Sequence, residues 1–256
     1  MPLKIGIELA GLGLPAKNAL RAAADLGADA VEIDARGEFA PRNLSETGLR
    51  QLRKMLGDLR LRVATVSFRT RRGYDMPADL DARVEATKAA MVLAAQVGAS
   101  SVVNHVGRVT DGGDDSLLVE VLTDLAAYGN HVGAFLAAET GAESGPDLAR
   151  LFDRLPEGTI GIDLNPGNLA AGGYSPIEAI EALGPRILHV HATDGYCDLA
   201  TRRGEQVPLG TGSTDFPTLF AMLGESGYHG YFTIRAHGAD DPLAAAGNAV
   251  AYLRKI

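Results

Sequence analysis

The sequence predicts a closed (β/α)8 TIM barrel with eight parallel strands. Eight short β-rich runs alternate with helical patterns along the whole chain, and 256 residues are enough for eight such units. Strands separated by helices return to the same edge of a sheet and therefore run parallel. Three helices are expected to end at Gly27, Gly98 and Gly227, where a left-handed residue is needed, with a strand starting about three residues later.

Each strand is predicted from a run of apolar and β-branched residues. Turn-forming or charged residues flank each run on both sides. The eight runs lie at residues 3–9, 29–35, 61–68, 100–106, 133–139, 159–164, 187–192 and 231–236. Between them, apolar residues recur at helical spacing, as at Leu49, Leu52 and Leu56, and residues 78–98 form a long helix candidate. An open doubly wound sheet is the alternative. It requires a glycine-rich phosphate turn, and the segment after the first run lacks the third glycine.

Composition limits the classes of protein. No linker, charge block or low-complexity run divides the chain, so residues 1–256 are read as a single barrel domain. No apolar run reaches the ~18 residues of a membrane span, the start lacks a signal pattern, and the lone Cys197 fits a reducing compartment; a cytoplasmic protein is expected. The net charge of −8 and a pI near 5.2 argue against nucleic-acid and membrane partners.

Ionisable side chains end four successive late strands of the predicted barrel. They are Glu139, Asp163, His191 and Arg235. The carboxyl ends of barrel strands converge on one mouth, so these side chains are expected to lie together, although single carboxylates after a strand also fit helix caps. Two carboxylates and an imidazole are a common ligand set for Mn²⁺, Zn²⁺ or Mg²⁺. His189, one pleat deeper, is expected to be a hydrogen-bonded core residue.

Arginines gather at the same end of the predicted barrel. Arg69 follows the third strand, Arg203 lies in the long loop after the seventh, and Arg235 ends the eighth. In an acidic chain, this bias predicts a mouth that attracts an anionic small molecule such as a sugar phosphate or a sugar acid. Solvation on the surface explains any one arginine equally well. The loop itself is long enough to suggest a function, and it leaves Arg203 and Glu205 free to reach over the mouth.

Several phrases carry a family resemblance. GADAVEID, AAET, DLNPGNL, RILHVHATD and VPLGTGSTDFPTLFAMLGESGYHGYFTI occur in this order over nearly the whole chain. Together they resemble the xylose isomerase-like TIM barrels, the sugar phosphate isomerase and epimerase group that also contains endonuclease IV. The resemblance implies one divalent metal held by a Glu, an Asp, a His and a second Glu. It carries the first three ligands onto Glu139, Asp163 and His191, and the fourth position falls on Arg235.

Arg235 changes what the resemblance implies, because it removes a ligand and a base. Each unit-charge pair at ~5 Å and an effective dielectric near ~20 is worth about 3 kcal/mol, so a metal should bind weakly or not at all. The His expected three residues after the Asp is replaced as well, by Pro166. Two arrangements remain: Arg235 pairs with Glu139 or Asp163 as an internal cation, or it binds the substrate beside a weak metal. We favour the second, because a three-ligand metal keeps open positions for substrate.

The predicted function is a sugar or sugar-phosphate isomerase or epimerase that uses metal-assisted proton transfer. Glu139, Arg235 and His237 are the predicted catalytic residues, with His237, Glu205 or Glu32 standing in for the missing base. The predicted substrate-binding residues are His105, Arg203, Glu205, Arg69 and Glu32. A barrel that binds a sugar or polyol without catalysis and an inosose-type dehydratase are the alternatives. Barrels of this kind often pair, which leaves a homodimer open.

Overall fold

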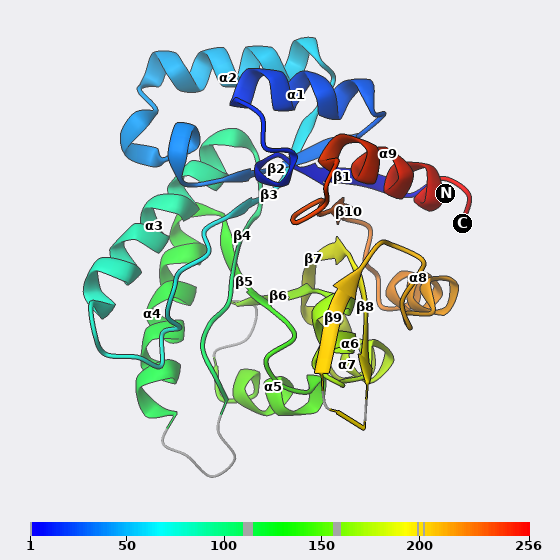
Figure 1. Ribbon diagram of the computed structural model, residues 1–256. Coiled ribbons are helices and arrows are strands. Elements are labelled where there is room, and N and C mark those ends of the chain that lie inside the picture. Colours follow the sequence, from blue (N-terminus) through cyan, green and yellow to red (C-terminus); the bar gives the residue numbers. More distant parts are fainter. Residues whose placement is uncertain (1, 110–114, 156–159, 199, 202) are drawn as a thin grey trace.

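The computed structural model describes residues 2–109, 115–155, 160–198, 200–201 and 203–256. Its core is a closed parallel barrel in which β10 pairs with both β7 and β1 (Figure 1). The barrel strands are β1 (Lys4–Glu8), β2 (Ala30–Asp34), β3 (Arg62–Ser67), β4 (Ser101–Asn104), β5 (Phe135–Glu139), β6 (Gly161–Leu164), β7 (Ile187–Ala192) and β10 (Tyr231–Ile234). The predicted (β/α)8 barrel is confirmed, strand by strand; residue 159, the first of the sixth predicted run, lies outside the described residues.

Helices follow the strands and cover the outside of the barrel (Figure 1). They are α1 (Ala16–Asp25), α2 (Glu46–Asp58), α3 (Leu80–Val97), α4 (Ser116–Val132), α5 (Gly145–Phe152), α6 (Pro166–Ala171), α7 (Pro176–Leu183), α8 (Phe216–Glu225) and α9 (Pro242–Leu253), with short 3-10 turns at Ala10–Leu12, Gly37–Phe39, Pro41–Asn43 and Gly184–Arg186. The predicted apolar face of α2 is buried at Leu49, Leu52 and Leu56. The predicted left-handed glycines have φ angles of +82°, +80° and +81° at residues 27, 98 and 227.

Pairing of the first and last strands closes the barrel. Ile5 lies opposite Phe232 in the parallel register of β1 and β10. The chain ends meet at the same place, where the Arg254 guanidinium donates to the Leu3 carbonyl at 2.7 Å and to the Asp29 carboxylate at 2.9 Å. The two termini therefore lie side by side next to α9 (Figure 1).

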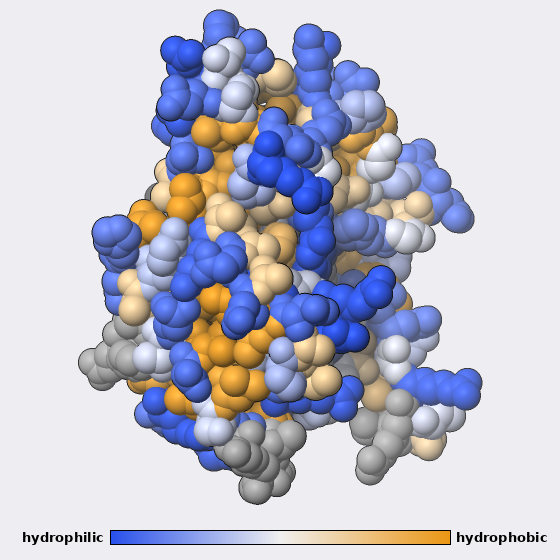
Figure 2. All heavy atoms as spheres, turned by 90° about the vertical axis from the view of Figure 1, so that its left-hand side faces the viewer, coloured by the Kyte–Doolittle hydropathy of each residue, from blue (hydrophilic) through white to orange (hydrophobic). Residues whose placement is uncertain are grey.

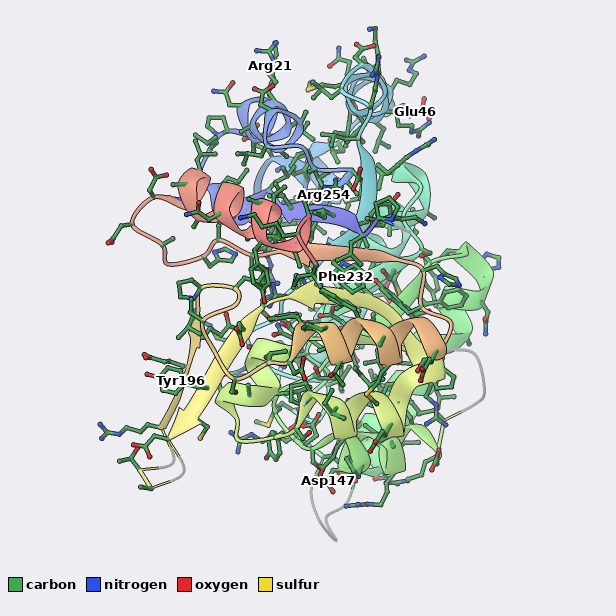
Figure 3. The ribbon with its side chains drawn as sticks, turned by 90° about the vertical axis from the view of Figure 1, so that its right-hand side faces the viewer. Arg21, Glu46, Asp147, Tyr196, Phe232 and Arg254 are labelled. Carbon is green, nitrogen blue, oxygen red and sulfur yellow. The ribbon has the colours of Figure 1, made fainter. Side chains whose placement is uncertain are left out.

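The long loop after β7 contains an antiparallel hairpin that the sequence did not predict. Its strands are β8 (Asp194–Asp198) and β9 (Arg203–Val207), and they project from the barrel with Tyr196 on the exposed side (Figure 3). Both strands are short and polar, so they lack the apolar alternation from which a strand is read. The hairpin packs on α6 instead, and a Cβ on Gly204 would lie only 1.9 Å from the Ala171 carbonyl oxygen.

Asp194 fixes the loop that follows the hairpin. Its buried carboxylate accepts hydrogen bonds from the backbone N–H groups of Gly195, Gly210, Gly212 and Thr214, at 2.8 to 3.2 Å. The loop then enters α8, where Asp215 caps the helix by accepting from the Thr218 N–H at 3.2 Å. The glycine-rich turn before α8 is therefore structural.

The outer surface differs from one side to the other. On the side that α3 and α4 cover, apolar side chains reach the surface in a patch that charged side chains interrupt (Figure 2). Exposed apolar area of this kind is ordinary for a folded domain. None of the described helices combines the length and the apolar character needed to cross a bilayer.

The barrel interior below the strand ends is polar and hydrogen-bonded. Thr65 on β3 donates to the Ser101 carbonyl at 3.0 Å, and His189 on β7 contacts the Thr233 hydroxyl at 2.8 Å. Gly6 leaves room for this layer, because a Cβ there would lie 2.6 Å from the Thr233 hydroxyl oxygen. This filled layer forms the floor of the mouth, the end of the barrel where the strands terminate.

Candidate functional site

Strand register brings the predicted strand-end residues to one level at the mouth. Glu139 on β5 lies opposite Asp163 on β6, which lies opposite His189 on β7. On the other side of the barrel, Glu8 on β1 lies opposite Glu32 on β2. Parallel pairing without a large offset therefore collects the ionisable groups in one layer.

His189 and His191 on β7 connect Asp163 on β6 with Glu32 on β2. The Asp163 carboxylate contacts His189 Nδ1 at 2.8 Å through one oxygen and His191 Nδ1 at 2.7 Å through the other. The far nitrogen of His191, Nε2, contacts Glu32 at 2.7 Å. His189, Asp163, His191 and Glu32 are all at least 99 % buried. His189 is thus the hydrogen-bonded core residue that the sequence suggests, and His191 bridges two carboxylates.

Burial and neighbouring charges shift the pKa values of these residues in opposite directions. Burial is the largest effect on His191 and lowers its pKa, as does the Arg235 charge, but Asp163 and Glu32 outweigh both and raise the pKa to about 9. Burial lowers the pKa of His189, so that imidazole is neutral near pH 7. Burial alone would raise the pKa values of Glu32 and Asp163. His191, with the charges of Arg235 and Arg69, outweighs burial at Glu32, and the two histidines outweigh it at Asp163, so both pKa values are lowered. His191 is therefore an imidazolium that lies between the carboxylates of Asp163 and Glu32.

Arg235 turns back from the end of β10 onto Glu139. Its Nη1 donates to Glu139 Oε1 at 2.5 Å, and both side chains are 9 % exposed. Of the two arrangements left open by the sequence, the internal ion pair is therefore the one present, although it uses a single nitrogen. Burial raises the pKa of Glu139, but the Arg235 charge contributes to a net lowering, so this carboxylate stays ionised. Nη2 of Arg235 is buried and has no hydrogen-bond partner among the described residues.

Two asparagines, the residue that caps α6 and one in its first turn, donate to the same oxygen of Glu139. Asn165 Nδ2 lies 2.8 Å and Asn168 Nδ2 lies 3.2 Å from Glu139 Oε1. The Asn165 amide is held in this orientation because its Oδ1 accepts from the Asn168 N–H and from the Thr193 hydroxyl. Gln206 on the hairpin donates to Asn168 Oδ1 at 2.5 Å. The hairpin is thereby connected to the Glu139–Arg235 pair.

Arg69, Glu8 and His237 complete the mouth. Arg69 Nη1 donates to Glu8 at 2.8 Å, and other nitrogens of the guanidinium lie 3.6 Å from Glu32 and from Glu139. His237 Nε2 lies 2.7 Å from the second oxygen of Glu8. The contact with Glu8 is the largest influence on His237 and raises its pKa. The His237 side chain is about half exposed, unlike the other groups of the site.

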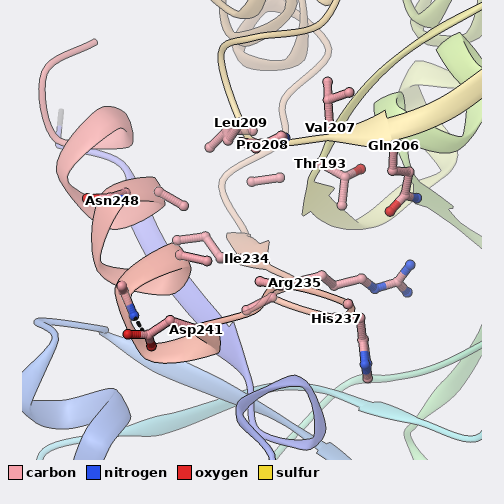
Figure 4. A pocket seen from close by; sticks show the side chains of 17 residues that line it. Thr193, Gln206, Val207, Pro208, Leu209, Ile234, Arg235, His237, Asp241 and Asn248 are labelled. Carbon is pink, nitrogen blue, oxygen red and sulfur yellow. Dashed lines mark hydrogen bonds between the residues drawn. The ribbon is translucent and has the colours of Figure 1, made fainter.

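A cavity of about 490 Å³ opens beside Arg235 and His237. Its walls come from the ends of β7 and β10, the end of the hairpin at Gln206, and α9 (Figure 4). In this view Arg235 and His237 both leave the end of β10 and point away from α9. The volume lies within the ~300 to 1,000 Å³ range of small-molecule sites. Of the ionisable groups of the site, Arg235 and His237 line this cavity.

The structure brings most of the predicted site residues together. Glu32, Arg69, Glu139, Asp163, His191, Arg235 and His237 form one connected cluster. Three predicted substrate-binding residues lie elsewhere. His105 contacts the Thr70 carbonyl at 2.5 Å, whereas Arg203 and Glu205 are exposed on the hairpin, where Glu205 accepts from the Tyr196 hydroxyl. Arg203 and Glu205 thus make no contact with the cluster in the described part of the chain, and their role in substrate binding stays a prediction.

Four site residues were missed from the sequence. Glu8 ends β1 just as Glu139 ends β5, so the rule applied to the late strands would have found it on the first one. Asn165, Asn168 and Gln206 have no such signal. Their roles depend on how α6 and the hairpin sit against the barrel.

The predicted metal ligands lie close together, but other protein groups already contact their ligand atoms. Ligand atoms of Glu139, Asp163 and His191 lie within 4.8 Å of one another, and so do those of Glu32, His189 and His191. Both ring nitrogens of His191 nevertheless contact carboxylates, and Glu139 Oε1 already accepts from three donors. A dication at this point would also face the Arg235 guanidinium. The side chains as arranged do not fit a divalent metal, and the ligand assignment stays a prediction.

A closed parallel barrel with ionisable side chains at the strand ends is the arrangement of TIM-barrel enzymes. The chain belongs to the xylose isomerase-like TIM barrel family, whose sequence model matches residues 20–256. A xylose isomerase domain protein from Planctomyces limnophilus has the same fold at 25 % identity and a TM-score of 0.85, covering 100 % of this chain and 98 % of that one. A xylose isomerase-like TIM barrel protein from Mycobacterium smegmatis, solved with magnesium, is 19 % identical with a TM-score of 0.76, covering 99 % and 95 %.

Curated relatives match over a shorter stretch. An inosose dehydratase from Clostridium beijerinckii is 26 % identical over 131 residues, which is 46 % of this chain and 41 % of the relative. The chain thus spans less than half the length of this relative. Sequence similarity and structural similarity agree on the family and leave the reaction open.

Proposed function

We propose that this barrel removes a proton next to the carbonyl of a sugar or a sugar-like polyol and returns it to give an isomer or epimer. The observation that carries the proposal is the pairing, beside one cavity, of an unpartnered buried guanidinium nitrogen with a half-exposed imidazole. The fold is shared with a D-tagatose 3-epimerase-like protein, which supports this reaction class.

His237 would act as the base and Arg235 as the electrophile. Glu8 orients the imidazole through Nε2, which leaves Nδ1 to take the proton from carbon. The electrons of the broken C–H bond move to the carbonyl oxygen, and Nη2 of Arg235 stabilises the resulting enediolate. Return of the proton from His237 to the neighbouring carbon, while the hydroxyl proton of that carbon passes to the former carbonyl oxygen, gives an isomer. Delivery of a proton to the original carbon from the opposite face, with water as the second acid, gives an epimer.

Glu139 would position Arg235 rather than move a proton. Its oxygen Oε1 is held by three donors and its pKa is lowered, so it is a poor base near pH 7. This role replaces the direct base chemistry expected for Glu139 from the sequence.

The substrate we propose is a neutral hydroxy-carbonyl compound rather than a sugar phosphate. Arg69 and Arg235 both reach the site, but each is paired with carboxylates. Four carboxylates, those of Glu8, Glu32, Glu139 and Asp163, surround these two guanidinium groups. The arginine bias seen in the sequence therefore does not produce a positive mouth among the described residues, and hydroxyl groups suit this mixture of donors and acceptors better than an anion.

The test is solvent isotope exchange followed by product analysis. The purified protein is incubated in D₂O with neutral ketoses, keto-inositols and sugar phosphates, and deuterium at the carbon next to the carbonyl is measured by NMR. We expect exchange with a neutral compound. No exchange across the panel, together with measurable sugar binding, would favour the alternative of a barrel that binds without catalysis.

Dehydration is the second candidate, because inosose dehydratases are relatives and elimination begins with the same proton removal. The same experiment separates the two. Loss of water gives an unsaturated ketone that absorbs in the ultraviolet, whereas isomerisation conserves the elements of the substrate.

A further inference from the structure

We propose that Arg235 is a built-in cation that takes the place of a divalent metal, so that the native chain holds no metal between Glu139, Asp163 and His191. The proposal rests on the disagreement between the family's expected ligand set and the contacts observed. It concerns metal binding and does not depend on which reaction the barrel catalyses.

The guanidinium occupies the oxygen that a metal would need. Arg235 Nη1 lies 2.5 Å from Glu139 Oε1, and its Nε lies 3.9 Å from Glu8. The Arg235 side chain is 9 % exposed, so water screens its charge little. A dication within a few ångströms of a fixed guanidinium is strongly repelled.

The surrounding side chains also suit an organic cation better than a metal. The amide groups of Asn165 and Asn168 donate to the same Glu139 oxygen, and an amide N–H competes with a metal for the lone pairs of that oxygen. Asn165 cannot turn its amide oxygen inward without losing the α6 cap to Asn168 and the bond from Thr193. The helix cap therefore keeps a hydrogen-bond donor pointed at Glu139.

The contacts of His191 also disfavour a bound metal. Its two ring nitrogens contact Asp163 and Glu32 at 2.7 Å each, so neither nitrogen presents a lone pair to the space beside Glu139. The predicted ligands are close enough to form a metal site, but each is engaged by another protein group.

The first experiment measures metal in the native protein. Untagged protein is purified with Mn²⁺, Zn²⁺ and Mg²⁺ present, dialysed without chelator, and analysed for metal content. We expect far less than one ion per chain, and a melting temperature that neither EDTA nor Mn²⁺ changes. Retention of about one ion per chain that is lost in Asp163→Asn would overturn the proposal.

The second experiment compares Arg235→Glu with Arg235→Gln. Arg235→Glu adds a ligand and removes the repulsion, and Mn²⁺ titration should show binding at least about 100-fold tighter than in the native chain. Arg235→Gln removes only the charge, so its affinity should lie between the two. The tighter binding of Arg235→Glu should disappear when Glu139→Gln is added. Folding is checked by circular dichroism for each variant.

The outcomes separate this inference from the proposed reaction. If neither folded variant binds Mn²⁺ more tightly than the native chain, Arg235 is not what excludes the metal and the inference is wrong. If Arg235→Glu does not fold, the native measurement and Arg235→Gln still decide. Isotope exchange by a native protein that retains a metal would contradict this inference and leave the proposed function standing.

Discussion

Arg235 and His237 stand two residues apart at the end of β10, yet their surroundings differ. Arg235 is buried and held by Glu139, whereas His237 is half exposed and contacts Glu8. A fixed charge suits stabilisation of an oxyanion, and an exposed imidazole suits proton transfer with a substrate. The two side chains therefore divide the proposed chemistry between them.

His237 is expected to be essential for the proposed exchange. Replacing it by Asn keeps a polar group of similar size but removes the base, so the exchange rate should fall by ~10² to 10⁴. The native rate should also rise with pH as the imidazole, whose pKa is raised by Glu8, loses its proton. His229→Asn is the matched control, because His229 is exposed on the loop before β10. An unchanged rate in His237→Asn would remove His237 from the mechanism.

At the level of elements, one buried carboxylate on β8 holds the glycine-rich loop that follows the β8–β9 hairpin. Four backbone N–H groups depend on Asp194, and Gln206 connects the hairpin to the site. Such a loop, tied to its neighbours by hydrogen bonds rather than by apolar burial, is sensitive to loss of a single acceptor.

Asp194→Ala should therefore destabilise the protein much more than a similar change further along the hairpin. We expect a loss of about 3 kcal/mol in the free energy of unfolding, since several buried N–H groups lose a charged acceptor. Asp198→Ala removes a carboxylate that accepts from the Ala200 and Thr201 N–H groups at an exposed position, and should cost much less stability. Urea titration of both variants measures the difference. Equal losses would show that the Asp194 contacts are not what holds the loop.

At the level of the whole molecule, buried ionisable groups favour stability on the acid side of neutrality. The pKa values of Glu32, Glu139 and Asp163 are lowered, so their contributions are present above the ordinary values of 4.5 and 3.8 and are lost on acidification. The pKa of His191 is raised from 6.5 to about 9, so its contribution is full below pH 6.5 and is lost through pH 9. The pKa of His189 is lowered, so its contribution is present above pH 6.5 and is lost on acidification. Together these five groups place the highest stability near pH 6.5.

Glu143, which lies outside the cluster at the mouth, contributes separately to the pH dependence of stability. Burial, with a contribution from Asp147, raises its pKa from 4.5 to about 7, and its Oε2 has no hydrogen-bond partner in the described part of the chain. The raised pKa therefore costs stability progressively as the pH rises from 4.5 to about 7, and Glu143→Gln should recover up to about 3 kcal/mol at pH 8 but little at pH 5. Melting temperatures of both proteins from pH 4 to 9 test this. Parallel curves for the two proteins would contradict the raised pKa.

Much of the fold and part of the site follow from local patterns. Apolar runs, helical spacing and glycines at helix ends predict the barrel because each depends on neighbours in the chain. The position of Glu139, Asp163, His191 and Arg235 at the ends of strands predicted that these side chains lie together, and the structure brings them to one mouth. The hairpin escaped prediction because its strands are stabilised by each other and by α6 rather than by an apolar pattern of their own.

The sequence by itself determined the barrel and the convergence of charged strand ends, because the direction of a side chain on a strand depends only on position along the chain. Tertiary structure alone decided how those charges pair. Arg235 meets Glu139, 96 residues away in sequence, and the asparagines of α6 and Gln206 of the hairpin fix the orientation of that pair. Such pairings require that elements far apart in the chain are placed to within a few tenths of an ångström. No local pattern encodes that placement.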